Sequence, residues 1–194
     1  MLSNEILEKL KQEQELTNEE ISFILPEIIS KSKEWLDKVP INNEKKCVES
    51  NKIMQIICDR MNIYYFPLDT RDLQDEKLFH KFGLIIFNTQ TSPIIYLSDL
   101  TYNQFKVEPE YKDVSPSNFL REDLFGKLKE NGYLPFTKEI FENYIMSFIC
   151  ASTKINKNNL FESINNELKE FGIKFNSEEN YSFKNQELNK NFQK

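Results

Sequence analysis

The stretch from His80 to Asp99, HKFGLIIFNTQTSPIIYLSD, decides the fold because it predicts a β-hairpin. Two runs rich in Ile, Phe, Leu and Tyr, Phe82 to Phe87 and Ile94 to Leu97, flank the polar cluster Asn88 to Ser92. Branched and aromatic residues favour strands, and short polar residues favour turns. The sequence therefore predicts two antiparallel strands at the centre of the chain.

The register of this hairpin brings its two ends together. A four-residue loop over 88–91 pairs Phe87 with Ser92, and the same register sets His80 opposite Asp99. Directly opposed side chains have Cβ atoms about 5 Å apart, close enough for an imidazole–carboxylate hydrogen bond. A two-residue change in loop length leaves them diagonal neighbours, whereas a one-residue change places them on opposite faces. Their predicted face carries the apolar side chains Phe82, Leu84, Ile86, Ile95 and Leu97.

Helices are predicted on the N-terminal side of the hairpin. A short polar helix is expected over 4–15, followed by a capping box, Thr17 to Glu20, that starts a helix reaching about Lys38. Pro26 should bend or interrupt that helix. Apolar residues recur at helical spacing from about Cys47 to Met61 and predict a further helix.

The C-terminal side also reads mainly as helix. A strand is possible over 104–107, and helices are expected over 117–130, 137–151 and 158–171. Asn131-Gly132 and Gly172 fit the ends of two of them. Residues 177–194 are polar and lack periodicity, so we expect a flexible tail.

Cys47 is the candidate nucleophile because it lies at the predicted start of a helix, directly after Lys45 and Lys46. The exposed N–H groups of a helix start and two neighbouring ammonium groups both stabilise a thiolate. Cys58 and Cys150 lie within helices among apolar residues and are expected to be structural. Taken alone, Cys47 would also be read as a small buried hydrophobic residue.

A thiol nucleophile requires a base, and the base requires a third group that fixes its tautomer. His80, the single histidine, would be the base and Asp99 the orienting acid. A histidine considered alone is more often a surface or capping residue. The predicted hairpin register is what favours the catalytic interpretation, because it places His80 beside a carboxylate.

At this point the residues resemble a known family. His80-Lys-Phe82 and Tyr96-Leu-Ser-Asp-Leu-Thr-Tyr-Asn-Gln-Phe105 are similar to the His and Asp segments of papain-like and transglutaminase-like thiol enzymes, over about residues 41–106. The resemblance implies a Cys47, His80 and Asp99 catalytic triad. Two features depart from it: Ile41 stands where papain-type enzymes have a glutamine, and Val48 follows Cys47 in place of an aromatic residue.

The missing glutamine leaves the oxyanion hole to the backbone N–H of Cys47 and a second donor. Asn42 and Asn43 are the nearest candidates, although asparagines in polar loops usually form turns. Gly83, in the first hairpin strand, could admit a substrate backbone or mark a β-bulge.

Composition limits the other classes. The 194 residues carry 25 Lys and Arg against 31 Asp and Glu, a net charge of −6, which disfavours nucleic acid as a partner. Four glycines form no phosphate-binding motif, and three cysteines with one histidine form no zinc-site spacing, so no cofactor or metal is expected. No apolar run is long enough to span a membrane, and the N-terminus does not read as a signal peptide. Abundant Lys, Asn and Ile suggest a bacterial, AT-rich genome.

These observations predict one α+β domain with a papain-like or transglutaminase-like arrangement, in which a nucleophile helix packs on a small antiparallel sheet between N- and C-terminal helices. The expected parts are a helical region 1–40, a catalytic core 41–107, a helical cover 117–172 closing the domain at 176, and the tail 177–194. The expected activity is acyl transfer or hydrolysis on a protein or peptide amide, as in a protease, glutamine deamidase or transglutaminase. Such a protein would be cytoplasmic or exported without a cleavable signal, as a bacterial effector is. The alternative is a non-catalytic helical interaction module.

Overall fold

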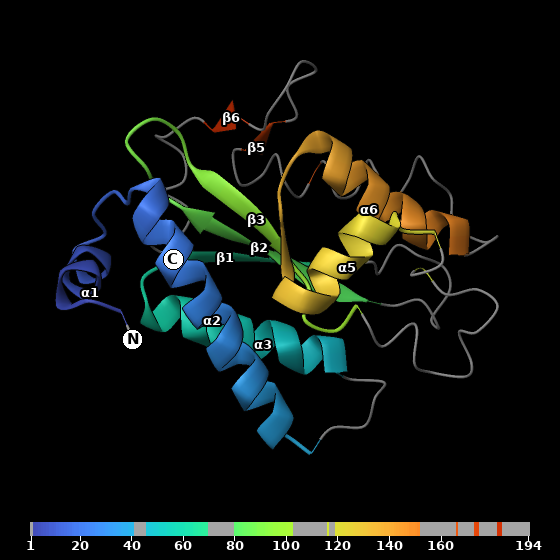
Figure 1. Cartoon of the computed structure of the whole chain (residues 1–194), viewed down its shortest axis with the longest axis horizontal. Helices are drawn as coiled ribbons and strands as arrows, with labels where there is room; N and C mark the ends of the chain where they lie inside the picture. Colours follow the sequence, from blue (N-terminus) through green and yellow to red (C-terminus); the bar gives the residue numbers. More distant parts are fainter. Residues whose placement is uncertain are drawn as a thin grey trace.

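The computed structural model describes residues 2–40, 46–69, 80–102, 116, 119–151, 166, 173–174 and 182–183. Within these residues the chain is α+β, with five helices and a four-stranded antiparallel sheet of strand order β1-β2-β3-β4 (Figure 1). Two further strands of two residues each, β5 (Ile173–Lys174) and β6 (Ser182–Phe183), pair with each other. The predicted fold class is therefore confirmed at the level of an α+β chain with a small antiparallel sheet.

The predicted hairpin is present as β2 (Lys81–Phe87) and β3 (Ile94–Ser98), but the predicted register is wrong by two residues. Phe87 pairs with Ile94, not with Ser92. The reason lies in the connection, where the Thr89 hydroxyl donates to the Ser92 carbonyl at 2.6 Å. Pro93 cannot donate a ladder hydrogen bond, so the turn takes six residues. Continuing this register makes His80 and Asp99 diagonal neighbours on one face of the sheet.

The N-terminal helices follow the predicted capping signals. Helix α1 (Asn4–Lys11) is shorter than expected, and α2 (Asn18–Lys38) starts at the capping box, with both Thr17–Glu20 hydrogen bonds formed. Of the bend or interruption expected at Pro26, the interruption is absent, because α2 runs unbroken through this residue. A proline costs a helix one hydrogen bond, and the buried apolar face of α2 offsets that cost. Helix α3 (Lys46–Arg60) carries Cys47 in its first turn, as predicted.

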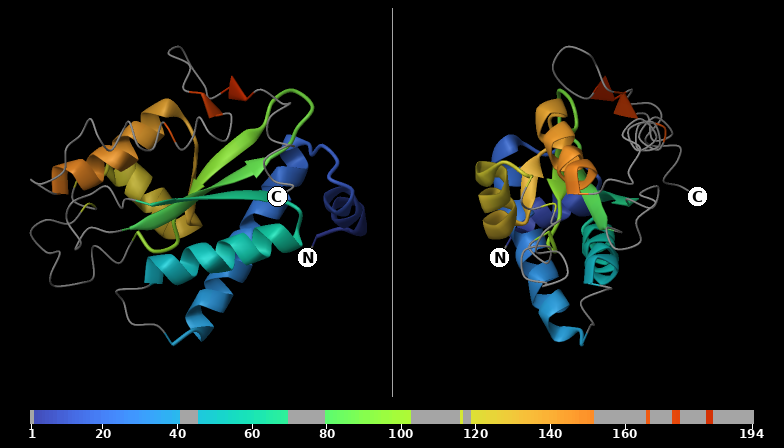
Figure 2. Two further views of the ribbon diagram at one scale, coloured as in Figure 1. Left: turned by 180° about the vertical axis from the view of Figure 1, so that it is seen from behind. Right: turned by 90° about the vertical axis from the view of Figure 1, so that its right-hand side faces the viewer.

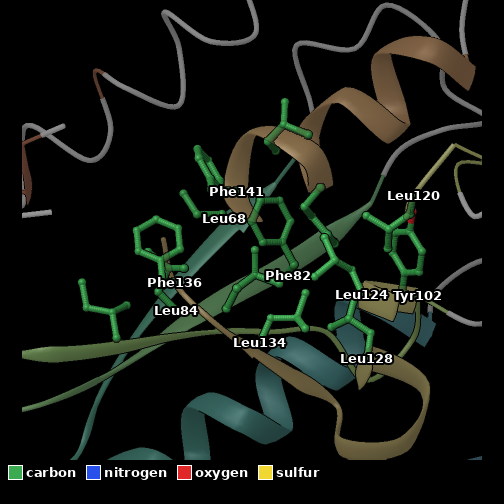
Figure 3. Packing of buried hydrophobic residues seen from close by; sticks show 14 of the residues in the cluster. Leu68, Phe82, Leu84, Tyr102, Leu120, Leu124, Leu128, Leu134, Phe136 and Phe141 are labelled. Carbon is green, nitrogen blue, oxygen red and sulfur yellow. The ribbon is translucent and has the colours of Figure 1, made fainter. Parts of the chain in front are cut away.

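The sheet separates two hydrophobic clusters, one on each face. Helices α1, α2 and α3 pack against one face through residues that include Tyr65, Ile85 and Phe87. Figure 2 shows α3 running alongside β1. The other face, with the predicted apolar ladder, packs against α5 (Glu122–Asn131) and α6 (Lys138–Ala151). Figure 3 shows this second cluster, in which sheet and helix side chains interdigitate: Leu68, Phe82, Leu84, Leu124, Leu128, Leu134 and Phe141.

Two strands of the main sheet carry no clear sequence signal. Strand β1 (Tyr64–Asp69) contains Pro67, which is tolerated because β1 is an edge strand. Strand β4 (Tyr133–Pro135) has only three residues and follows Gly132, which ends α5 with φ of +79°. Both strands form by pairing with the predicted hairpin. Strand β1 pairs with the outer edge of β2, and β4 pairs with the outer edge of β3.

Helices α5 and α6 match two of the expected C-terminal helices, with α5 beginning at Glu122 rather than near 117. The possible strand over 104–107 lies outside the described residues. So does the helix expected over 158–171, apart from residue 166, which is helical. Of the predicted tail 177–194, only the two residues of β6 are described.

Candidate active site

Cys47 lies where a helix start meets the sheet. It occupies the first turn of α3, and the residues that follow it on the same helix face are buried: Asn51, Met54 and Cys58. Backbone N–H groups in a first turn have no acceptor inside the helix. The Lys81 N–H, at the start of β2, lies near the Cys47 side chain and lowers the pKa of its thiol. The thiol therefore lies beside a backbone donor from β2 and in the first turn of a helix.

His80 and Asp99 form a buried pair beside Cys47. The distance from His80 Nε2 to Asp99 Oδ2 is 2.7 Å. The exposed fractions of Cys47, His80 and Asp99 are 1%, 0% and 3%. The structure therefore brings together all three residues of the predicted triad. Because Nε2 is bonded to Asp99, Nδ1 is the ring nitrogen left to exchange a proton with the thiol.

Four donors hold the Asp99 carboxylate. The Thr101 N–H and hydroxyl donate to Oδ1 at 3.0 and 3.2 Å, while Oδ2 accepts from His80 and from the Tyr144 hydroxyl, the latter at 2.7 Å. The Asp99 N–H donates to the carbonyl of Gly132 at 3.0 Å. Its backbone and both carboxylate oxygens are thus fixed, which satisfies the demand of a buried carboxylate for partners.

The surroundings of Cys47 and His80 favour a thiolate on Cys47 and an imidazolium on His80. Burial opposes both charged forms, but Asp99 and Cys47 together raise the pKa of His80 to about 10. For Cys47, burial alone would raise the pKa, yet the nearby His80 ring, with its positive charge, and the Lys81 N–H leave that pKa below its usual value. Cys58 lacks such partners, and burial raises the pKa of its thiol. Of these two buried cysteines, only Cys47 therefore has surroundings that favour the thiolate form.

Gly83 has a role that the sequence did not suggest. Strand β2 is regular at Gly83, which pairs with Pro67 and Ser98, so the expected bulge is absent. The space a side chain would fill is taken by Tyr65, whose hydroxyl oxygen lies 2.2 Å from an ideal Cβ position. The Tyr65 ring thus occupies the space beside Gly83, where a substrate backbone was one of the two expectations.

The Tyr65 ring crosses Gly83 to reach helix α3. Its hydroxyl donates to Asn51 Oδ1 at 2.7 Å, and Asn51 Nδ2 donates to the Cys47 carbonyl at 3.1 Å. This buried chain ties β1 to the first turn of α3. Gly83 therefore supports the position of Cys47 indirectly, by admitting Tyr65.

We expect Gly83→Ala to lower the free energy of unfolding by about 1–3 kcal/mol or more, because the methyl group overlaps the Tyr65 ring. Gly126→Ala is a matched control: nothing lies within 4 Å of its added Cβ in the exposed part of α5, and alanine favours helix by about 0.5–1 kcal/mol. Urea unfolding of both variants measures the difference. Equal midpoints for Gly83→Ala and the wild type would contradict the packing argument, and a Tyr65→Ala background should remove most of the cost.

Several site residues have no recognisable sequence signal. Thr101 lies in the Tyr96 to Phe105 segment that carries the family resemblance, but Tyr144 comes from α6, 45 residues beyond Asp99. The Lys81 N–H and the pair Tyr65–Asn51 also act through tertiary contacts alone. Asn42 and Asn43, the predicted oxyanion donors, lie outside the described residues.

The described residues contain no group of three or more His, Cys, Asp or Glu side chains that could hold a metal ion. Within the same part of the chain, no helix has both the length and the apolar character needed to cross a membrane. Comparison with known proteins gives no match to any family model, curated protein or solved structure.

Proposed function

We propose that this protein is a thiol enzyme in which Cys47, His80 and Asp99 form a catalytic triad of the papain-like or transglutaminase-like kind. The substrate would be an amide of a protein or peptide, and the activity that of a protease, glutamine deamidase or transglutaminase. The observation that carries the proposal is the buried His80–Asp99 hydrogen bond of 2.7 Å beside a helix-start cysteine, whose pKa the His80 ring lowers.

In the proposed first half-reaction, the Cys47 thiolate attacks the carbonyl carbon and the C=O electron pair moves onto oxygen. As this tetrahedral intermediate collapses, the C–N bond breaks and His80 transfers its Nδ1 proton to the leaving nitrogen. The products are an acyl-enzyme thioester, a free amine or ammonia, and a neutral His80 that still donates from Nε2 to Asp99.

In the second half-reaction, His80 takes a proton from water or from a second amine as that group attacks the thioester. The C–S bond breaks and the thiolate leaves, so the imidazolium–thiolate pair is restored. Water as the acceptor gives hydrolysis or deamidation, and an amine gives transfer. Asp99 stabilises the imidazolium in both halves without itself taking the proton.

Charge on the tetrahedral oxygen requires hydrogen-bond donors. The backbone N–H of Cys47 is one candidate because it lies in the first turn of α3. A second donor, for which Asn42 and Asn43 are the candidates from sequence, would complete the hole.

Product mass tests the proposal. We expect wild-type protein, incubated with a peptide library and a biotinylated primary amine, to generate products that Cys47→Ala does not. New peptide termini indicate hydrolysis, a gain of about 1 Da at glutamine indicates deamidation, and biotin on peptides indicates transfer.

Cys58→Ser is the matched control, since it removes a buried thiol of raised pKa from the same helix and should retain the products per folded molecule. Identical product profiles for the wild type and Cys47→Ala, with both proteins folded, would contradict the proposed function.

A further inference from the structure

Tyr144 shares a single carboxylate oxygen with the proposed catalytic base. Its hydroxyl donates to Asp99 Oδ2 at 2.7 Å, and His80 Nε2 lies at the same distance from that atom. Tyr144 is fully buried, and burial with the adjacent Asp99 charge raises the pKa of its phenol well above the usual value. The phenol therefore stays protonated and remains a donor.

The position of Tyr144 is set from several sides. Its ring packs against Phe82 and Phe148, with centroids 5.0 and 5.3 Å apart, and Phe148 stacks on the His80 ring at 5.5 Å. One turn along α6, the Ser147 hydroxyl donates to the Tyr144 carbonyl and accepts from Tyr102. These contacts hold the Tyr144 ring on several sides, with its hydroxyl beside Asp99 Oδ2.

We propose that Tyr144 is a positioning residue for the reaction proposed above, which competes with His80 for Asp99 Oδ2 and so limits how tightly the carboxylate holds the imidazolium. A hydrogen bond to a carboxylate spreads its charge and weakens its pull on a second partner. A less tightly held imidazolium gives up its proton to the leaving nitrogen more readily.

Within the described part of the chain, the groups that act on His80 come from three elements. Asp99 attracts its positive charge from the end of β3, and the Cys47 thiolate does so from α3. Tyr144, on α6, is a neutral phenol that contacts Asp99. Tyr102, after β3, is a neutral phenol that lies near the charge of Asp99. Among these, Tyr144 is the only one that can be altered at Asp99 Oδ2 without removing a member of the triad.

The test uses the single histidine of the chain, whose ring nitrogens give unambiguous signals in ¹⁵N NMR. In Tyr144→Phe, Oδ2 keeps only His80, and the pKa of His80 should rise by roughly 0.5–1.5 pH units. Tyr102→Phe is the matched control: it removes a buried hydroxyl from the same aromatic cluster that bonds Ser147 rather than Asp99, and it should leave this pKa nearly unchanged.

An unchanged or lowered pKa of His80 in folded Tyr144→Phe overturns the inference. If that variant does not fold, 3,5-difluorotyrosine at position 144 keeps the ring and the hydroxyl, and its stronger donation should lower the pKa of His80; no change or a rise overturns it. Repeating both measurements in Cys47→Ala separates the two ideas, because the link through Asp99 does not need the thiol. A shift there without thiol chemistry in the wild type would count against the proposed function alone.

Discussion

His80→Ala should slow alkylation of Cys47 by roughly 100-fold or more at pH 6. An ordinary thiol, with a pKa of about 8.5, is ionised to only about one part in 300 at that pH. In the wild type the pKa of Cys47 is lowered by His80 in spite of burial. In His80→Ala the imidazole is absent, and burial, which raises the pKa of Cys47, becomes the strongest remaining effect. The thiolate fraction of Cys47 should therefore fall below that of an ordinary thiol.

The measurement is the rate of modification by iodoacetamide, followed by mass spectrometry of the peptide that contains Cys47, between pH 5.5 and 9. The wild-type rate should change little with pH over the range in which the ion pair persists, whereas the His80→Ala rate should rise about tenfold per pH unit. Burial of Cys47 slows modification in both proteins. Cys58 provides an internal control of global opening, and equal rates at Cys47 in the two folded proteins would rule out a catalytic pair.

Asp99→Asn should cost about 10³- to 10⁴-fold in turnover on any peptide substrate found, since the same change in a Ser-His-Asp triad costs about 10⁴-fold. The physical reason follows from the four hydrogen bonds. If the asparagine oxygen keeps the Thr101 donors at the Oδ1 position, its NH₂ group faces His80 Nε2 and donates to it. The ring proton then lies on Nδ1, directed at Cys47, and His80 can no longer accept a proton there.

Thr101→Val is the informative companion to Asp99→Asn. It removes one hydroxyl donor from Oδ1 but keeps the carboxylate charge and the backbone N–H, so its loss of turnover should be much smaller. Circular dichroism and thermal unfolding confirm that each variant is folded before turnover is compared. A loss of less than about tenfold for folded Asp99→Asn would mean that Asp99 does not set the tautomer of His80.

The sequence alone determined the local structure around the candidate site. The capping box at Thr17 set the start of α2, because capping is decided by residues three positions apart. The hairpin and its apolar face followed from alternation and turn residues, and helical spacing placed Cys47 in the first turn of α3. Even with the register wrong by two residues, His80 and Asp99 stayed on one face, because side chains alternate with a period of two.

What only the tertiary structure decided is how separate elements meet. The six-residue connection between β2 and β3 fixes the register of the hairpin. No local sequence pattern distinguishes this connection from one of four residues. The contact of Tyr144 with Asp99 and the crossing of Gly83 by Tyr65 join residues from different layers. Such contacts depend on how helices dock on the two faces of the sheet, which is set by the packing of whole apolar surfaces. Local sequence determined which side chains could form the site, and packing determined their partners.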